Sequence, residues 1–188
     1  MERAQSQATS RDSDEPLIDR FLKGDMAAFD ELVRKYQRPL YGLAMRYVRD
    51  ADDAKDVSQK AFVRAFESLS KFRQASTFRT WLYRITVNLA LNHVRDRKPN
   101  DPVAAEQLAA EPCVYERASE KESKQRLRAA LESLPQKQRL VVELRIYEEL
   151  PFCEVAEIAG CSENAAKVNF HHAVKKLREA MGGCRESK

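Results

Sequence analysis

The segment from Thr77 to Arg97, TFRTWLYRITVNLALNHVRDR, constrains the fold more than any other part of the chain. Its apolar residues recur at steps of three and four, the pattern of a helix with one buried face. They are Phe78, Trp81, Leu82, Ile85, Leu89 and Val94, and Trp81 is the only tryptophan of the chain. The segment therefore predicts one long helix that packs in a core.

The opposite face of this helix is basic and rich in amides. It carries Arg79, Arg84, Asn88, Asn92, His93, Arg95 and Arg97, and Asp96 is the only acid of the segment. Arginines commonly bind phosphates, and asparagines bind base edges. The face is therefore suited to contact with a polyanion.

Composition favours an all-α fold. Only 5 Gly and 7 Pro interrupt long stretches of Ala, Leu, Glu, Lys and Arg in the 188 residues. No apolar run approaches the roughly 20 residues of a membrane span. The N-terminus also lacks the apolar core of a signal peptide. We expect a cytoplasmic protein without membrane insertion.

Charge is distributed unevenly along the chain. Residues 16–98 hold 17 Lys and Arg against 10 Asp and Glu, a net of +7, whereas residues 99–122 hold 2 against 6, a net of −4. This predicts two small helical domains, over residues 16–98 and 123–181, joined by an acidic flexible linker over 99–122. Residues 1–15 are expected to be a disordered tail and residues 182–188 a C-terminal tail.

Apolar spacing and helix-breaking residues predict the individual helices. In the first domain we expect helices over residues 16–23, 26–48 and 51–69 before the one from Thr77, with Pro39 kinking or dividing the second. Asp25, Asp50 and Ser76 or Thr77 are the expected N-caps of the three long helices. In the second domain we expect helices over residues 117–134, 136–149, 152–159 and 163–181.

Residues 152–170, FCEVAEIAGCSENAAKVNF, fit a helix-turn-helix. Ala156 is small enough for a close helix crossing, and Gly160 tolerates positive φ in the turn. The second helix of such a motif enters the major groove of DNA. Its expected outward residues are Asn164, Lys167, Val168, Asn169, His171, His172 and Lys175.

The sequence contains no set of residues that supports catalysis or a cofactor. It has no P-loop, no nucleophile–base pair and no metal cluster. His171 and His172 point about 100° apart on a helix and are unsuited to chelate one ion. The cysteines (Cys113, Cys153, Cys161 and Cys184) form no C-x-x-C pair and are expected to be reduced. A redox role for Cys153 and Cys161, which flank one short helix, stays open.

Three stretches of the sequence resemble bacterial extracytoplasmic-function (ECF, group IV) sigma factors of the sigma-70 family. They are residues 28–66, 71–95 and 134–181, and the most specific block is FRTWLYRI-x-VN-x-A in the second. The resemblance extends from Leu17 to Met181. It implies two helical domains, which are called σ2 and σ4 in that family, with an acidic linker between them.

The resemblance implies a function in three parts. One is binding of a β′ coiled coil of core RNA polymerase through Asp53, Asp56, Gln59, Phe62 and Arg64. Another is reading and melting of the promoter −10 element, with one base flipped out, by Lys71, Phe72, Arg73, Gln74, Ser76, Arg79, Arg84, Asn88 and Arg95. The third is reading of the −35 element by the outward residues of the last helix. Ser58 and Lys60 depart from the family's usual Val or Leu and Glu.

The implied partners are core RNA polymerase with its β′ and β subunits, promoter DNA in double- and single-stranded form, and an anti-sigma factor. Two other functions fit parts of the sequence: a helix-turn-helix regulator that acts without the polymerase core, and a sigma-mimicking adaptor. The first leaves the basic Trp helix unexplained, and the second leaves the +7 charge of residues 16–98 unexplained. The acidic linker is suited either to the polymerase cleft or to a plain tether.

Overall fold

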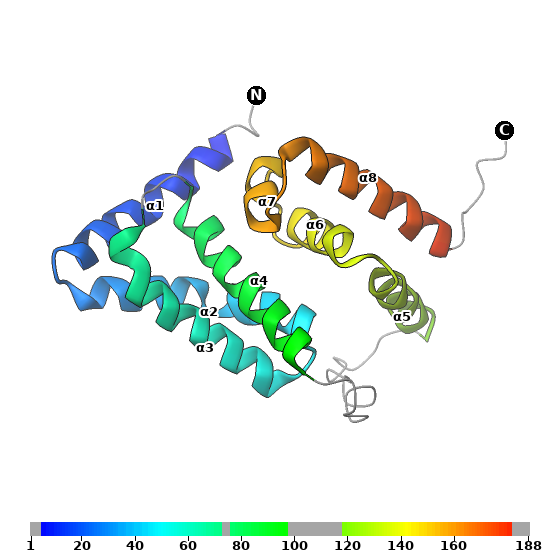
Figure 1. Ribbon diagram of the computed structural model, residues 1–188, viewed down its shortest axis with the longest axis horizontal. Helices are drawn as coiled ribbons and strands as arrows, with labels where there is room; N and C mark the ends of the chain where they lie inside the picture. Colours follow the sequence, from blue (N-terminus) through cyan, green and yellow to red (C-terminus); the bar gives the residue numbers. More distant parts are fainter. Residues whose placement is uncertain (1–4, 73–75, 98–117, 182–188) are drawn as a thin grey trace. The chain divides into compact units, whose positions relative to one another are not determined.

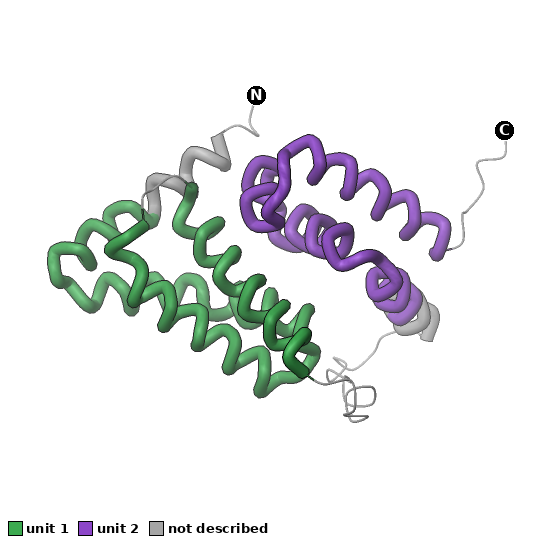
Figure 2. The backbone as a smooth tube through the Cα atoms, viewed as in Figure 1, with its two compact units in different colours: residues 1–108 green, residues 109–188 purple. Residues whose placement is uncertain are grey.

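The structure is a computed structural model that describes residues 5–72, 76–97 and 118–181. Side chains are described over residues 14–72, 76–97 and 125–181. Over these ranges the chain is helical and contains no strand. It divides into two compact units, residues 1–108 and 109–188 (Figure 2). The expectation of an all-α fold with two helical domains is confirmed.

Unit 1 is a bundle of helices around one core (Figure 1). The helices are α1 (Gln5–Leu22), α2 (Met26–Val48), α3 (Ala51–Ser68) and α4 (Phe78–Asp96), and a short 3₁₀ turn, η2 (Leu69–Lys71), follows α3. Helix α2 packs on α1, α3 and α4, and α3 packs on α4. Leu32, Leu40 and Leu43 of α2 and Leu82 of α4 are fully buried in this core.

Helix α4 packs through a face that is displaced from the predicted one. Its buried residues are Phe78, Thr80, Leu82, Tyr83, Thr86, Val87 and Ala90. Trp81, Ile85 and Leu89, which the sequence assigns to the core, are only half-buried, and Val94 is exposed. The assignment was wrong for these four residues. Two neighbouring stripes of α4 both fit a helical period, and the apolar residues alone do not decide between them. The stripe that is buried also contains two threonines, Thr80 and Thr86.

Short polar side chains begin the long helices of unit 1, as the sequence predicts. Asp25, Asp50 and Thr77 are the N-caps of α2, α3 and α4, and each accepts a hydrogen bond from a backbone N–H of the first turn. The first N–H groups of a helix lack intrahelical partners, so these caps fix where each helix starts. Pro39 lies inside α2, which continues through it and is not divided.

Helix α1 begins earlier than the sequence predicts. It starts at Gln5 and contains Pro16, which was expected to open it. Asp14 is buried in unit 1, where it accepts hydrogen bonds from Lys35 and Tyr36 of α2. The tail expected over residues 1–15 is therefore helical from Gln5 onward. The polar composition of residues 5–15 conceals this helix from an apolar-period argument.

Unit 2 contains α5 (Ala118–Glu132), α6 (Gln136–Ile146), α7 (Phe152–Ala159) and α8 (Glu163–Ala180). Helix α8 packs on α5, α6 and α7. Its Ala173 lies in a core cluster with Leu134 and Val142. The linker expected over residues 99–122 ends earlier, because α5 begins at Ala118, and α6 is shorter than its predicted range of 136–149.

Helices α7 and α8 form the predicted helix-turn-helix. Gly160 has φ of 60°, in the left-handed region, and this lets the chain turn directly after α7. Ser162 caps α8 by accepting a hydrogen bond from the N–H of Ala165 at 3.2 Å. Ala156 and Ala166 are both buried, as small residues at a close helix contact should be.

Replacing Leu82 tests the inner face of α4. Leu82→Ala should lower the free energy of unfolding of unit 1 by about 2–5 kcal/mol, because it leaves a cavity in the core. Val94→Ala should change it by less than about 0.5 kcal/mol, because Val94 is exposed. Urea unfolding followed by Trp81 fluorescence reports on this unit, since the chain has no other tryptophan. Equal losses for both variants would contradict the packing described above.

Candidate nucleic-acid interface

The outward face of α4 carries a basic and amide-bearing stripe. Arg84, Asn88 and Arg95 are exposed, and their spacing places them on one side of the helix. The guanidinium of Arg95 lies 3.2 Å from the Asp96 carboxylate. An exposed ion pair of this kind contributes little to stability, because water screens it. The structure therefore brings these three predicted residues together, and their contact with DNA stays a prediction.

Arg79 does not join this stripe. Its guanidinium lies over the ring of Tyr83, 5.2 Å from the ring centroid. Its charge also acts on Tyr36 of α2, whose pKa it lowers against larger opposing effects. The structure thus separates Arg79 from Arg84 and Arg95, with which the sequence grouped it.

Phe72 anchors the segment between α3 and α4. Its ring centroid lies 5.1 Å from that of Trp81 and 6.3 Å from that of Phe78. The ring of Phe78 is in turn 5.6 Å from that of Tyr36. The one aromatic side chain of the predicted −10 set therefore already packs on α4. Trp81, which the sequence assigned to the core, is half-buried beside it.

The remaining predicted residues of this segment divide into two groups. Arg73 and Gln74 lie outside the described residues. Lys71 is exposed at the end of η2, and Ser76 is half-buried. Ser76 lines a cavity of about 100 Å³. The rest of the lining comes from Phe72, Thr77 and Phe78 and from Asp14, Glu15 and Ile18 of α1.

Asp14 borders this cavity from α1. It is 2% exposed, and its carboxylate accepts a hydrogen bond from the Tyr36 hydroxyl at 2.5 Å and another from the Lys35 ammonium. Burial, followed by the hydrogen bond to Asp14, raises the pKa of Tyr36 far above its usual value. At neutral pH the Tyr36 hydroxyl therefore keeps its proton and donates a hydrogen bond to Asp14.

The outward face of α3 carries some of the residues predicted to bind polymerase. Asp56 and Gln59 are exposed on it. Val63 shares this side of the helix and is 57% exposed, although the sequence analysis did not select it. Phe62 is half-buried and Arg64 is exposed, and the two lie on opposite flanks of this face. The four-residue step from Gln59 to Val63 is the signal that locates the missed residue.

Asp53 points to α4 instead. Its carboxylate lies 2.8 Å from the guanidinium of Arg97 and 3.1 Å from Nε2 of His93. The pKa of the neighbouring Asp50 is lowered, chiefly because its carboxylate accepts a hydrogen bond from the backbone N–H of Asp53. Asp53 therefore joins the start of α3 to the end of α4, and the structure does not group it with Asp56.

Three phenylalanines fix the C-terminal part of α3. Phe66 packs on Phe21 of α1 and Phe29 of α2, with ring centroids 5.3 Å and 5.1 Å away, and Phe21 lies 5.4 Å from Phe29. Phe66 nevertheless remains 40% exposed. An apolar surface next to Val63 is thus held in place by three helices.

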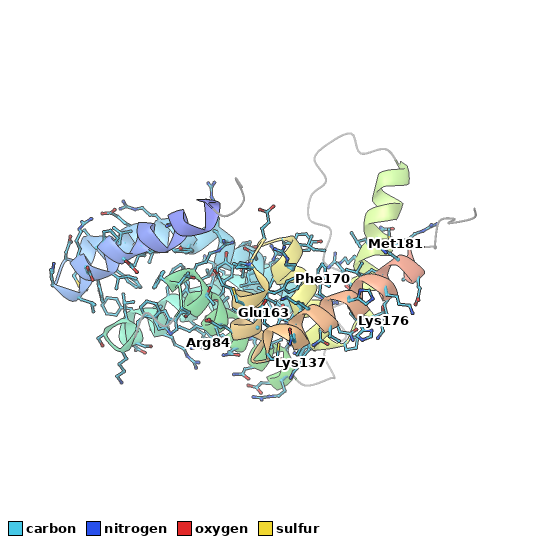
Figure 3. The ribbon with its side chains drawn as sticks, turned by 90° about the horizontal axis from the view of Figure 1, so that it is seen from above. Arg84, Lys137, Glu163, Phe170, Lys176 and Met181 are labelled. Atoms are coloured by element: carbon cyan, nitrogen blue, oxygen red, sulfur yellow. The ribbon has the colours of Figure 1, made fainter. Side chains whose placement is uncertain are left out.

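Helix α8 presents a second polar stripe. It consists of Asn164, Lys167, His171 and Lys175, which are exposed at steps of three or four, with Val168 and His172 exposed along its edge. The ammonium of Lys167 lies 2.7 Å from the Glu163 carboxylate. Asn169 is half-buried toward another side, so the structure separates it from the stripe. Figure 3 shows the helix running from Glu163 past Phe170 and Lys176 to Met181.

The stripe borders a groove of about 620 Å³. The apolar lining consists of Phe152, Phe170 and Val174, and the charged and polar lining consists of Lys167, His171, Lys175, Arg178 and Glu179. The ring of Phe152 packs on that of Phe170 at 5.5 Å and carries the guanidinium of Arg145 at 5.1 Å. Arg178 extends the basic stripe by one more step, and its interval of seven residues from His171 is the signal that identifies it.

Other chemistry finds little support in the described residues. They contain no group of His, Cys, Asp or Glu that could hold a metal ion. Cys153 and Cys161 are free thiols, whereas Cys113 and Cys184 lie outside the described residues. None of the helices in residues 5–72, 76–97 and 118–181 combines the length and hydropathy of a membrane span.

Sequence comparison identifies both units. Sigma-70 region 2 matches residues 32–99, and Sigma-70 region 4 matches residues 124–177. The chain is 33% identical over 184 residues to the RNA polymerase sigma-H factor of Pseudomonas aeruginosa, an alignment that covers 92% of this chain and 95% of the relative. It is 36% identical over 181 residues to the ECF RNA polymerase sigma-E factor of Escherichia coli K12, covering 90% and 92%. The chain belongs to the ECF sigma factors.

Two solved structures share the fold of this sigma factor. CnrH, solved in complex with the cytosolic domain of CnrY, superposes with a TM-score of 0.70 at 24% identity, covering 92% of this chain and 99% of that one. RpoE of Bartonella quintana, solved with the anti-sigma factor NepR, gives 0.68 at 24% identity, covering 84% and 98%. Sigma factors are transcription initiation factors and not enzymes.

The ion pair of Asp53 with Arg97 and its contact with His93 predict a measurable effect on the stability of the sigma factor. Asp53→Ala should lower the free energy of unfolding of unit 1 by about 1 kcal/mol at low salt. Asp56→Ala is the matched control, because Asp56 pairs, among the described residues, with the exposed Lys60 on its own helix. Urea unfolding followed by Trp81 fluorescence measures both variants. High salt should shrink the difference, since partly exposed pairs are screened. Equal losses would contradict a joining role for Asp53.

Proposed function

We propose that this ECF sigma factor binds core RNA polymerase in the cytoplasm, directs it to promoters with −10 and −35 elements, and promotes melting of the −10 end. One observation carries the proposal: two separately folded units each expose a polar helix stripe. The stripes are Arg84, Asn88 and Arg95 on α4 and Asn164, Lys167, His171 and Lys175 on α8. Each helix is held by a core on its other side. Rigid helices of this kind suit phosphates and base edges.

We assign polymerase binding to the outward face of α3. Asp56, Gln59 and Val63 form an exposed surface with an apolar centre and polar flanks, as protein interfaces commonly do. The contacts of Phe66 with α1 and α2 hold the end of this surface, so little ordering is needed on binding. Asp53 is left out of this set because its carboxylate pairs with α4.

We assign the −10 element to α4 and the segment before it. Arg84 and Arg95 hold backbone phosphates, and Asn88 between them binds a base edge. Phe72 and Trp81 pack together and remain partly exposed, so they offer an aromatic wall of the kind on which unpaired bases stack. Because Phe72 is already anchored to α4, this wall exists before DNA binds.

We assign the −35 element to the stripe of α8. Lys167 and Lys175 hold phosphates, while Asn164 and Val168 near the N-terminus of the helix face base edges in the major groove. The N-cap Ser162 and the buried Ala166 and Ala173 hold this helix against its unit. In this assignment His171 and His172 face the DNA.

An anti-sigma factor is the second protein partner that we propose. RpoE of Bartonella quintana, which shares the fold, was solved with the anti-sigma factor NepR. On this chain Val63 and Phe66 leave exposed apolar surface on α3, and surface of this kind commonly marks a docking site. A partner on this surface excludes core polymerase from the same face.

Run-off transcription with purified core polymerase tests the proposed function. A promoter-specific transcript should require this protein, and mutation of either the −10 or the −35 element should reduce it. Transcripts that do not depend on the protein would contradict the proposal. Duplex binding without any polymerase dependence would favour a helix-turn-helix regulator. Polymerase binding without any contact to −10 single strands would favour a sigma-mimicking adaptor.

Lys167 provides a specific test of the α8 assignment. Lys167→Ala should weaken binding of the holoenzyme to a −35 duplex about fivefold and reduce the salt slope by about one, because one phosphate contact is lost. Lys176→Ala removes the same charge from the side of α8 opposite Lys167, beyond the His172 edge of the stripe, and should have a clearly smaller effect. Fluorescence anisotropy at several salt concentrations measures both. Equal effects of the two variants would contradict the proposed docking face.

A further inference from the structure

Helix α1 lies outside the part of the chain that matches Sigma-70 region 2, which begins at residue 32. It nevertheless packs on α2 and lines the cavity beside the segment that precedes α4. Its Asp14 is 2% exposed. A carboxylate is seldom buried this far unless other groups satisfy it. The Tyr36 hydroxyl and the Lys35 ammonium do so here, and this ties α1 to α2.

Tyr36 extends this contact to the −10 segment through a continuous row of rings. Its ring packs edge-on against Phe78 at 5.6 Å, and Phe78 packs against Phe72 at 6.3 Å. Phe72 then lies 5.1 Å from Trp81. Aromatic contacts of this geometry are specific in direction as well as stabilising. Tyr36 is therefore connected to Phe72 through Phe78.

The cavity beside these rings is a second place where α1 lies near the segment that precedes α4. Asp14, Glu15 and Ile18 of α1 form one part of its lining, and Phe72, Ser76, Thr77 and Phe78 form the other. Across this cavity, side chains of α1 thus face Phe72 and Ser76, the described residues at the two ends of the segment between η2 and α4. The described residues at those ends, Phe72 and Ser76, are in the set assigned to the −10 element.

We propose that α1 is part of the −10 reader and that Asp14 is its positioning residue. By holding Tyr36, Asp14 fixes the wall of Phe72 and Trp81 in the orientation that drives opening of the −10 duplex. Asp14 itself touches no DNA and acts through Tyr36 and Phe78. The inference rests on the proposed function of α4 and adds to it a helix that lies outside the matched family region.

The experiment compares promoter opening on two templates with the full-length protein and core polymerase. One template is an intact duplex promoter, and the other is the same promoter with its −10 region pre-melted by mismatches. Permanganate reactivity of the −10 thymines measures opening of the intact duplex, and the yield of short transcripts measures initiation on the pre-melted template. Asp14→Ala should lower the open fraction about tenfold on the duplex, the scale of one lost hydrogen bond to a charged group. Asp14→Ala should leave initiation on the pre-melted template unchanged, because that template is already open.

Three further variants separate positioning from folding. Tyr36→Phe keeps the ring and removes only the hydroxyl, so it should also reduce duplex opening, and the double variant should be no worse than Asp14→Ala alone. Asp14→Asn keeps an acceptor for the Tyr36 hydroxyl and should recover most of the opening. Asp19→Ala removes an exposed acid from the same helix and should match the wild type.

Three results would overturn the inference. One is duplex opening by Asp14→Ala at the wild-type level. Another is an equal loss on both templates, which would indicate a purely structural role. If Asp14→Ala does not fold, Tyr36→Phe decides, and wild-type opening by that variant would overturn the inference. A wild-type protein that initiates on neither template would contradict the proposed function itself, which keeps the two failures distinct.

Discussion

The packing of α4 against α2 and α3 is the constraint on which unit 1 depends. One side of this helix is buried around Leu82 and Val87, and the side that remains outside carries Arg84, Asn88 and Arg95. A rotation about the helix axis that buried the stripe would place unpaired charge in the core, at a large cost in free energy. The core thus determines which polar groups α4 presents. The Thr86 hydroxyl donates a hydrogen bond to the Leu82 carbonyl at 2.9 Å. A buried polar side chain in this core thus has a hydrogen-bond partner on its own helix.

Helix starts and turns were predictable from the sequence, because residues close together in the chain determine them. The caps Asp25, Asp50 and Thr77, the left-handed Gly160 and the start of α8 after Ser162 all follow from short-range rules, and the structure has them. The helix-turn-helix belongs to the same class, because its turn and its small contact residues lie within one stretch. The all-α fold and its division into two units followed from these local signals together with composition.

Contacts between distant segments could not be predicted in the same way. Asp53 had the sequence position of a surface acid, but its partners His93 and Arg97 lie at the far end of α4. The buried stripe of α4 was placed one step away, since an apolar period cannot choose between two stripes that both fit. Asp14 lay in a segment that looked like a polar tail, and only Tyr36 of α2 explains its burial. In each case the deciding partner was remote in sequence.

The division into two units, each with its own core, affects how strong the binding of each unit needs to be. Residues 98–117 join the described parts of the two units, and 20 residues span at most about 70 Å even when fully extended. Once one unit is engaged, the other is confined near the same molecule at an effective concentration on the order of millimolar. Two modest affinities therefore combine into firm attachment. The same contacts can still be released one at a time, because each unit has a core of its own.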